Sequence, residues 1–528
     1  MVHSLVVFLK KLQTCSFLAT KLFSFTKSAQ QTIKYSCQFI CQNYPLFVEV
    51  IYFTSISLVG YAVLKVLKPH DLKDLDLLFT SVSASTVSGM STIEMEDFSS
   101  PQLWMLTILM LIGGEVFTSM LGFNFVRAKF DTKGLANQTD YSLTVDVESI
   151  DSENPGPNNT QQGTKASVPI SGLRLVDINH VEPKTVESLG YALMAYVLLI
   201  NLCSSLAIYI YLRLVPDAQD VLKQKGIGYV IFSVFTGISS VGNTGFTPAN
   251  ENMVIFQKNT ILLLLIIPQI LLGNTLFAPC LRFMIWSLKN ITGKKEYDFI
   301  LKHPEAVGYK HLMDTRECVY LVVTVVGFII TQTILFCGLE WKSEVLQEMN
   351  SYQKIVGALF QSVNARHAGE NIVDLSRLSS SILVLYTIMM YLPSYTSFLP
   401  KHEEQHSNVG MKDKRRNVCE NWILSQLSYL AIFVVLICIS ERESMTTDPL
   451  NFNVFSITFE VISSYGNVGF SLGYSCQRLL NHNIHCKDAS YGFAGKWSDK
   501  GKVILIIVMI FGRLKGFNMN GGRAWKLR

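Results

Sequence analysis

A short glycine-containing phrase recurs four times in this chain of 528 residues. The two clearest copies are FTGISSVGNTGF at 235–246 and FEVISSYGNVGF at 459–470. A fainter copy over 79–89 keeps the same spacing from phenylalanine to glycine, and a fourth over 360–369 is one residue shorter. Each copy stands between two apolar segments, so the repeated unit is a helix, a re-entrant loop and a second helix.

The apolar segments are long enough to cross a bilayer. Only 16% of the residues are charged and 49% are hydrophobic, whereas a soluble protein carries about a quarter charged residues. About 20 apolar residues span the hydrocarbon core. Eight candidate spans lie near 47–66, 102–123, 188–212, 257–283, 317–338, 379–399, 422–440 and 502–513. The sequence therefore predicts an all-α membrane protein with eight transmembrane helices and four re-entrant pore helices.

The four membrane–pore-loop–membrane repeats are separated by polar linkers. We place the repeats at 47–130, 186–285, 315–400 and 420–516. The linkers are then 131–185, 286–314 and 401–419, with a basic N-terminal segment 1–46 and a C-terminal segment 517–528. The linker 131–185 is rich in Asn, Ser, Thr, Gly and Pro and lacks the apolar content to pack, so we expect it to be disordered.

The distribution of charge predicts the orientation of the chain. Five lysines precede the first acidic residue, Glu49, and basic residues collect on the cytoplasmic side of membranes. We therefore expect both termini and the linkers in the cytosol, with the sequons at Asn137, Asn158 and Asn290 unmodified. The net charge of +5 follows from these segments and does not indicate nucleic-acid binding. Acidic residues near the loops predict a cation-attracting outer rim: Glu94, Glu96, Asp97, Glu251, Glu340, Glu370 and Asp374.

The glycines of the four loops carry the proposed chemistry. A dehydrated cation needs oxygen ligands, and backbone carbonyls of a selectivity filter supply them. Glycine adopts the required backbone angles at little cost. The equivalent positions are Gly89, Gly245, Gly369 and Gly469, each preceded by one of Ser88, Thr244, Ala368 and Val468. A single glycine of this kind often only ends a helix, but four in register favour an ion pathway along one water-filled axis.

Four stretches carry a resemblance to a known family. Residues 85–96, 243–253, 364–370 and 512–519 resemble the plant HKT transporters of the Trk/Ktr/HKT superfamily. The resemblance covers nearly the whole chain except the N-terminal segment and the linker 131–185. It implies one pseudo-fourfold pore per subunit, a homodimer, cytosolic termini, and movement of Na⁺ and K⁺ across the plasma membrane without a cofactor.

The first loop determines the expected ion preference. In the family, serine at the first filter position tends to accompany sodium selectivity, and glycine accompanies potassium permeation as well. The spacing places Gly89 there, so the resemblance implies a Na⁺ pathway that also admits K⁺. If Ser88 faced the ion instead, the preference would move to Na⁺ alone. A Na⁺-selective uniporter and a Na⁺-coupled K⁺ symporter remain the alternatives.

Several charged residues fall inside or beside the apolar segments. Arg513, near the inner end of the last span, either reaches the membrane interface or, as the resemblance implies, forms a positive barrier in the inner pore. Arg366 and His367 adjoin the third filter glycine, where we expect them to brace the pore helix and point away from the axis. Glu115 and Glu460 need partners, and structural bracing is the interpretation we favour.

Two further motifs have weaker implications. The pattern H-E-x-x-H at 402–406 matches zinc proteases, but it lies in a charged linker without an apolar helix or a third ligand. We therefore do not expect an enzyme. Cys476 and Cys486 fall in the last predicted outer loop, and a disulfide between them is left open.

Overall fold

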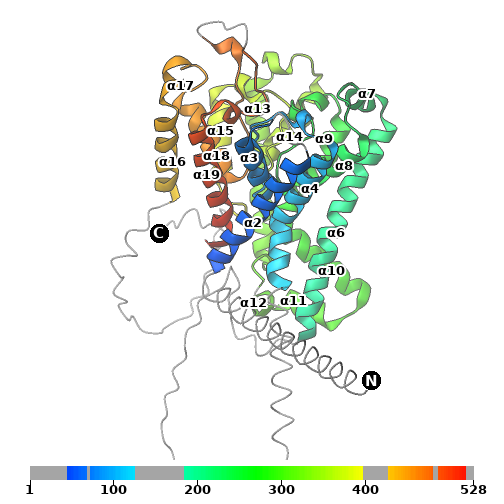
Figure 1. The fold of residues 1–528 in the computed structure, drawn as a ribbon. Helices are drawn as coiled ribbons and strands as arrows, with labels where there is room; N and C mark the ends of the chain where they lie inside the picture. Colours follow the sequence, from blue (N-terminus) through cyan, green and yellow to red (C-terminus); the bar gives the residue numbers. More distant parts are fainter. Residues whose placement is uncertain are drawn as a thin grey trace, which may run out of the picture.

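The computed structural model describes residues 45–67, 72–124, 183–307, 309–396, 426–479 and 486–518. Within these ranges the chain is helical, and its only β-type pairing is an isolated bridge between Tyr474 and Ala489. The sequons at Asn137 and Asn158 and the histidine motif at 402–406 lie outside the described residues. Figure 1 shows long helices arranged side by side around shorter central ones.

Three helices are each long and apolar enough to cross a membrane: α2 (Pro45–Leu67), α6 (Pro183–Leu214) and α13 (Thr315–Glu340). Three bent pairs also pass this test if each is counted as one span. They are α4 (Ser100–Gly113) with Glu115–Asn124, bent by 57°, α9 (Thr260–Gly273) with α10 (Phe277–Thr292), bent by 86°, and α7 (Pro216–Gln224) with α8 (Tyr229–Gly242), bent by 97°. These helices make the chain an all-α membrane protein.

Two of the eight predicted spans differ in their helices from the prediction. The predicted span 257–283 is broken between α9 and α10, and in the predicted span 379–399, which the structure describes as far as residue 396, the helix is α15 (Ser380–Tyr391). Proline removes a donor and disfavours helical backbone at the residue before it. Leu392, which precedes Pro393, is accordingly extended, and α15 ends there. The other apolar helices are α16 (Gln426–Ser440) and α19 (Asp499–Asn518).

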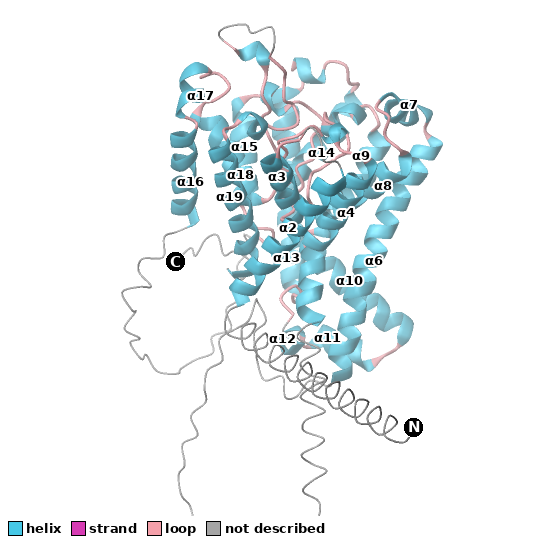
Figure 2. Ribbon diagram, in the orientation of Figure 1, coloured by secondary structure: helices cyan, strands magenta, loops and turns pink. Residues whose placement is uncertain are grey.

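The short helices predicted before the glycine loops are present. They are α3 (Asp74–Ser85), α8 (Tyr229–Gly242), α14 (Ser351–His367) and α18 (Val454–Gly466). Each packs against the apolar helices on either side of it in the chain, as α3 does against α2 and α4. In Figure 2 the irregular segments that follow these helices lie among the helices, in the upper half of the molecule.

Smaller helices connect these elements. The polar segment after α10 contains α11 (Lys295–Lys302) and α12 (Pro304–Val307), so the predicted linker 286–314 is largely helical. Asn290 lies exposed in the last turn of α10. The outer segments hold α17 (Arg442–Thr447) and the 3-10 turns η1 (Met95–Asp97), η3 (Asn252–Phe256), η4 (Glu344–Leu346), η5 (Leu375–Arg377), η7 (Cys476–Arg478) and η8 (Phe493–Lys496).

Buried polar side chains tie the start of one apolar helix to the end of another. Glu340, at the end of α13, accepts a 2.9 Å hydrogen bond from the Ser379 amide that begins α15. Glu441 likewise accepts a 3.0 Å bond from the Ser498 amide before α19. These carboxylates satisfy amides that a helix start leaves unpaired. The prediction that Glu340 belongs to an exposed acidic rim is therefore wrong, since only 3% of it is exposed.

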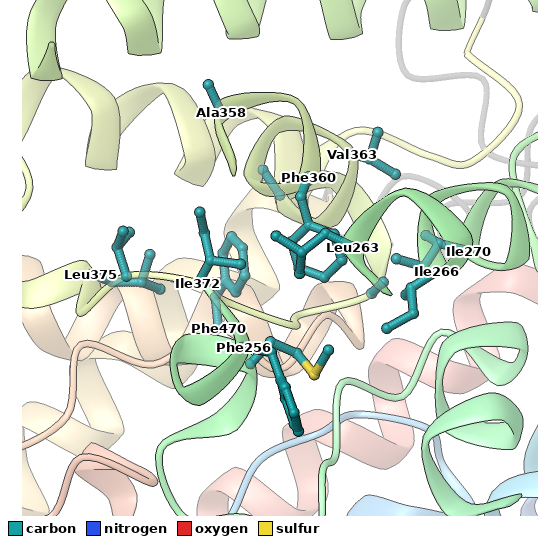
Figure 3. Packing of buried hydrophobic residues seen from close by; sticks show 14 of the residues in the cluster. Phe256, Leu263, Ile266, Ile270, Ala358, Phe360, Val363, Ile372, Leu375 and Phe470 are labelled. Carbon is teal, nitrogen blue, oxygen red and sulfur yellow. The ribbon is translucent and has the colours of Figure 1, made fainter. Parts of the chain in front are cut away.

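Apolar packing holds the loops from behind. Figure 3 shows Phe256, Phe360 and Phe470 among the aliphatic side chains of α9, α14 and the third loop. All three phenylalanines are at most 1% exposed. Phe360 is the first residue of the copy at 360–369, which is the third in chain order. Its counterparts Phe79, Phe235 and Phe459 are fully buried as well. The phenylalanine of the phrase is therefore a core residue that fixes each short helix.

A buried ion pair joins the first short helix to the last apolar helix. Lys502 Nζ lies 2.7 Å from Asp76 Oδ1, and their side chains are 5% and 12% exposed. Removing one partner of a buried pair costs about 3–5 kcal/mol because the other charge stays buried. We expect Lys502→Met to lower the apparent unfolding temperature in detergent, and Asp76→Leu/Lys502→Met to recover most of the loss. Equal loss in the single and double variants would contradict this account.

The outer segment between α18 and α19 contains a disulfide. Cys476 and Cys486 are bonded, which settles the pairing that the sequence leaves open. Beside it, the Tyr474 amide donates to the Ala489 carbonyl at 3.0 Å and the Ala489 amide donates back at 2.9 Å. Arg478 donates to the Ser376 carbonyl at 3.0 Å. This segment is thus attached to the outer part of the third unit.

Candidate functional site

The four short helices end in the same backbone hydrogen bond. After each helix, a backbone amide donates a hydrogen bond to the carbonyl of the residue five positions earlier. The four bonds run from Ser88 to Ser83 (2.8 Å), from Thr244 to Ser239 (2.9 Å), from Gly369 to Asn364 (3.3 Å) and from Val468 to Ser463 (3.0 Å). In three loops a left-handed residue precedes this amide, namely Val87, Asn243 and Asn467. The third loop lacks that residue, which accounts for its shorter phrase.

The four predicted glycines share an unusual backbone conformation. Their φ angles are +66° at Gly89, +84° at Gly245, +73° at Gly369 and +97° at Gly469. Residues with a Cβ rarely adopt such angles, and glycine does so at no steric cost. These positions therefore require glycine for their conformation, before any neighbour is considered.

The same glycines form a closed ring of backbone contacts. A Cβ added at Gly89, Gly245 or Gly369 would lie less than 3.0 Å from one carbonyl oxygen of the next loop. A Cβ at Gly469 would lie 3.0 Å from Gly89 Cα and 3.1 Å from the Ser88 carbonyl oxygen. The carbonyls met in turn belong to Thr244, Ala368, Val468 and Ser88. Each loop thus touches the next, and the fourth returns to the first.

The residues of this ring are those predicted from the phrase. Ser88, Thr244, Ala368 and Val468 are fully buried, and the structure brings all four together with the four glycines. The geometry leaves no space at the ring for a side chain at the glycine positions. At the glycine positions themselves the neighbouring loop therefore meets backbone atoms, and backbone carbonyls are the groups that coordinate a cation in a selectivity filter.

Side chains of two short helices bind the backbone of the extended segments that follow Gly369 and Gly469. Gln361 Oε1 accepts from the Ile372 amide at 3.2 Å, and Glu460 Oε1 accepts from the Leu472 amide at 3.2 Å. Both amides stand three residues after the loop glycine. Glu460 also accepts from the Ser471 hydroxyl. The bracing interpretation of Glu460 agrees with these contacts, which are to an amide and a hydroxyl.

Two buried hydrogen bonds connect neighbouring loops. Ser240 Oγ donates to Glu370 Oε1 at 2.6 Å, which links α8 to the residue after Gly369. Asn467 Nδ2 donates to Ser88 Oγ at 2.6 Å and to the Met509 carbonyl at 3.1 Å, which links the fourth loop to the first and to α19. Because Glu370 is fully buried, the prediction that it belongs to an exposed acidic rim is wrong.

The basic residue beside the third glycine faces away from the ring. Arg366 Nη2 donates to the carbonyls of Pro393 and Ser394 at 2.9 and 3.2 Å. Its guanidinium carbon lies 5.0 Å from the centre of the Phe328 ring on α13. Arg366 therefore supports the irregular segment after α15, as the bracing prediction expects, and its charge does not enter the contacts between the loops.

Arg513 is enclosed by protein. Only 8% of it is exposed, its Nη2 donates to the Gly113 carbonyl at the end of α4, and its guanidinium lies 5.6 Å from the Phe53 ring centre on α2. The carboxylates whose charges act on it are those of Glu115 and Glu49. These contacts contradict the alternative in which Arg513 extends to the membrane interface.

The outer rim is a small salt-bridge cluster. Lys225 Nζ lies 2.6 Å from Glu251 and 3.0 Å from Glu96, and Asn250 Nδ2 donates to Glu94 at 3.0 Å. Partial burial opposes the charge on Lys225, but its hydrogen bonds to the two glutamates raise the pKa of the ammonium group. Part of the predicted acidic rim is therefore neutralised by a lysine that joins the first and second units.

A second set of glycines was missed by the sequence interpretation. Gly113, Gly273 and Gly512 lie on α4, α9 and α19, and a Cβ on each would collide with the carbonyl of Ser85, Val241 or Tyr465 on the preceding short helix. Each glycine stands 14 residues after the residue that directly precedes its helix. These preceding residues are Ser99, Asn259 and Ser498. That shared spacing is the signal that would have revealed them. The third unit has Pro393 at this position instead.

Comparison with known proteins identifies the family. The family model TrkH, described as a cation transport protein, matches residues 178–399 and 396–524. The cation transporter HKT1;3 of Oryza sativa subsp. japonica is 68% identical over 531 residues, covering 100% of both chains. The sodium transporter HKT1 of Arabidopsis thaliana is 47% identical, covering 87% of this chain and 89% of its own. The crystal structure of the potassium transporter TrkH from Vibrio parahaemolyticus has a TM-score of 0.49 at 15% identity, covering 89% of this chain and 83% of its own.

The chain therefore belongs to the HKT cation transporters, within the TrkH family of cation transport proteins. The resemblance drawn from the loop motifs is confirmed. The expectation that the chain is not an enzyme is confirmed by the same membership, since these relatives are named as transporters.

Proposed function

We propose that the chain conducts Na⁺ and K⁺ through a selectivity filter formed by Gly89, Gly245, Gly369 and Gly469. The observation that carries this proposal is the closed ring in which each glycine loop touches the carbonyl of the next. In the proposed arrangement four membrane–pore-loop–membrane units surround one pseudo-fourfold axis. The carbonyls of the loops replace part of the hydration shell of the ion.

The setting of this pore is part of the proposal. A plasma-membrane protein with cytosolic termini would use the membrane potential, worth about 2.3 kcal/mol per charge per 100 mV. The basic N-terminal segment supports that orientation. A homodimer with one pore in each subunit follows from the family resemblance, and no cofactor is needed because the driving force is the ion gradient.

The direct test is two-electrode voltage clamp in oocytes, with external Na⁺ and K⁺ varied separately. We expect the reversal potential to shift with both ions. A potential that follows Na⁺ alone would favour the Na⁺-selective uniporter, and a K⁺ current that requires Na⁺ would favour the symporter. Absence of current from protein present at the cell surface would contradict the transport proposal itself.

Arg513 is proposed as a positive barrier in the inner pore. We expect Arg513→Gln to increase the inward current per surface transporter by up to about 30-fold, because one fixed charge at about 8 Å opposes a cation by about 2 kcal/mol at an effective dielectric constant of about 20. The control is Arg513→Lys, which keeps the charge but loses the planar guanidinium that binds the Gly113 carbonyl. Equal changes in both variants would show that Arg513 acts only as a brace for α4 and not as a barrier.

A further inference from the structure

A small cavity with a mostly apolar lining and a few polar side chains lies behind the second and third glycine loops. It is enclosed by the break after α9, by α13 and by α14, and its lining includes Asn243, Gln332 and Arg366. These side chains are 3%, 2% and 5% exposed. The cavity leaves about 10 Å³ for the centre of a water-sized sphere, close to the roughly 10–15 Å³ that one water molecule needs.

Each of the three side chains presents an unused polar atom. Arg366 Nε and Nη1, Asn243 Oδ1 and Gln332 Oε1 are buried and have no hydrogen-bond partner within the described part of the chain. A buried polar group without a partner costs about 1–3 kcal/mol. Such groups in native proteins are usually satisfied by protein or by ordered water. Four such atoms on the side chains that line one small cavity make it a candidate binding site.

The orientation of both amides is fixed by other contacts. Asn243 Nδ2 donates to the carbonyls of Val241 and Ile270, each at 3.2 Å. Gln332 Nε2 donates to the Phe328 carbonyl at 3.3 Å. An amide nitrogen cannot accept a hydrogen bond, so the nitrogen of each side chain must be the atom that faces these carbonyls. The oxygens, Asn243 Oδ1 and Gln332 Oε1, are then the atoms without a partner. Together these three side chains offer two acceptors and the N–H donors of one guanidinium, beside the other polar lining residues Thr275, Ser362 and His367.

This donor and acceptor set selects the ligand. A cation would be repelled by the buried guanidinium, and an anion would be repelled by two amide oxygens. A water molecule can accept from a guanidinium N–H and donate one hydrogen to each amide oxygen, which uses both of its hydrogens and one of its two lone pairs. We propose that one ordered water occupies this cavity and bridges Arg366, Asn243 and Gln332.

The bridge would connect two of the four loops. Asn243 stands two residues before Gly245, and Arg366 stands three residues before Gly369. Arg366 also holds the segment after α15, in the unit that has proline where the other three have a packing glycine. The water thus positions the second and third loops relative to α13. Any effect on ion selectivity rests on the proposed function, whereas the site itself does not.

The experiment is a crystal structure of the full-length protein grown with bromide in place of chloride, at a resolution that shows ordered water, together with the Gln332→Leu variant. Gln332 is chosen because it lies within α13, where leucine has a similar size and a good helix propensity. We expect water-like density within hydrogen-bond distance of all three side chains in the wild type. We expect that density to be lost in the variant.

Three results would overturn the proposal. An anomalous bromide peak in the cavity would show an anion site, an empty wild-type cavity would show that the polar atoms are satisfied by rearrangement, and density unchanged in Gln332→Leu would remove Gln332 from the site. None of these results depends on ion currents, so failure of the water site and failure of the transport proposal are separable. If Gln332→Leu does not fold, the wild-type density and the bromide signal alone decide.

Discussion

Gly369→Ala is expected to abolish the cation current while the protein still reaches the cell surface. The added methyl group would lie well inside van der Waals distance of the Val468 carbonyl and 3.0 Å from Gly469 Cα. Backbone atoms of a buried loop cannot move aside as the end of a flexible side chain can. A left-handed backbone adds about 1–2 kcal/mol for a residue with a Cβ. The contact between the third and fourth loops would therefore open.

The chain provides matched controls for this variant. Gly226 and Gly293 have φ angles of +68° and +66°, and an added Cβ at either position meets nothing within 4 Å. Gly226→Ala and Gly293→Ala thus carry the backbone cost without the collision. We expect both to keep currents close to wild type in voltage clamp at matched surface expression. If they lose current as fully as Gly369→Ala does, strain alone explains the loss, and the ring contact is not responsible.

The repeated phrase predicted the four glycines of the ring because both its glycines and its spacing follow from local backbone requirements. A helix that ends in a hydrogen bond to the carbonyl five residues earlier, followed by a glycine with positive φ, leaves its mark in the sequence at fixed positions. The same reasoning explains why the third copy is short, since it lacks the left-handed residue present at Val87, Asn243 and Asn467. The phrase does not reveal which backbone atoms each glycine contacts, because those atoms belong to the loop of another repeat.

Contacts between units were harder to predict. The break between α9 and α10 follows Gly273, whose backbone lies against the Val241 carbonyl of α8, and apolar composition around 257–283 gives no sign of that contact. Glu340 and Glu370 are acidic residues next to outer loops, yet one binds the start of α15 and the other binds Ser240. Sequence alone cannot distinguish an exposed carboxylate from one that is buried against a distant amide or hydroxyl.

The contact at Gly89 also changes the physical account of ion preference. A serine at this position was expected to reduce K⁺ permeation by placing its side chain at one corner of the ring. In the structure a Cβ at Gly89 is directed at the Thr244 carbonyl and lies 3.0 Å from Gly469 Cα, so the side chain would enter the contact with the second loop. Under the proposed function, selectivity would then change because a carbonyl of the neighbouring loop, to which we assign ion coordination, is displaced.

Gly89→Ser is expected to remove the response to K⁺ while leaving a reduced Na⁺ current, in contrast to Gly369→Ala, because the family resemblance implies that serine at the first filter position is compatible with Na⁺ transport. In the wild type the reversal potential should shift with both ions; in the variant it should approach about 59 mV per tenfold change in Na⁺ and become insensitive to K⁺. Gly89→Ala separates two causes, because it adds the same Cβ without a hydroxyl. If alanine behaves as serine does, displacement of the Thr244 carbonyl is responsible, and if only serine excludes K⁺, the hydroxyl itself acts on the ion. A Gly89→Ser variant that still follows K⁺ as the wild type does would exclude Gly89 as a determinant of selectivity.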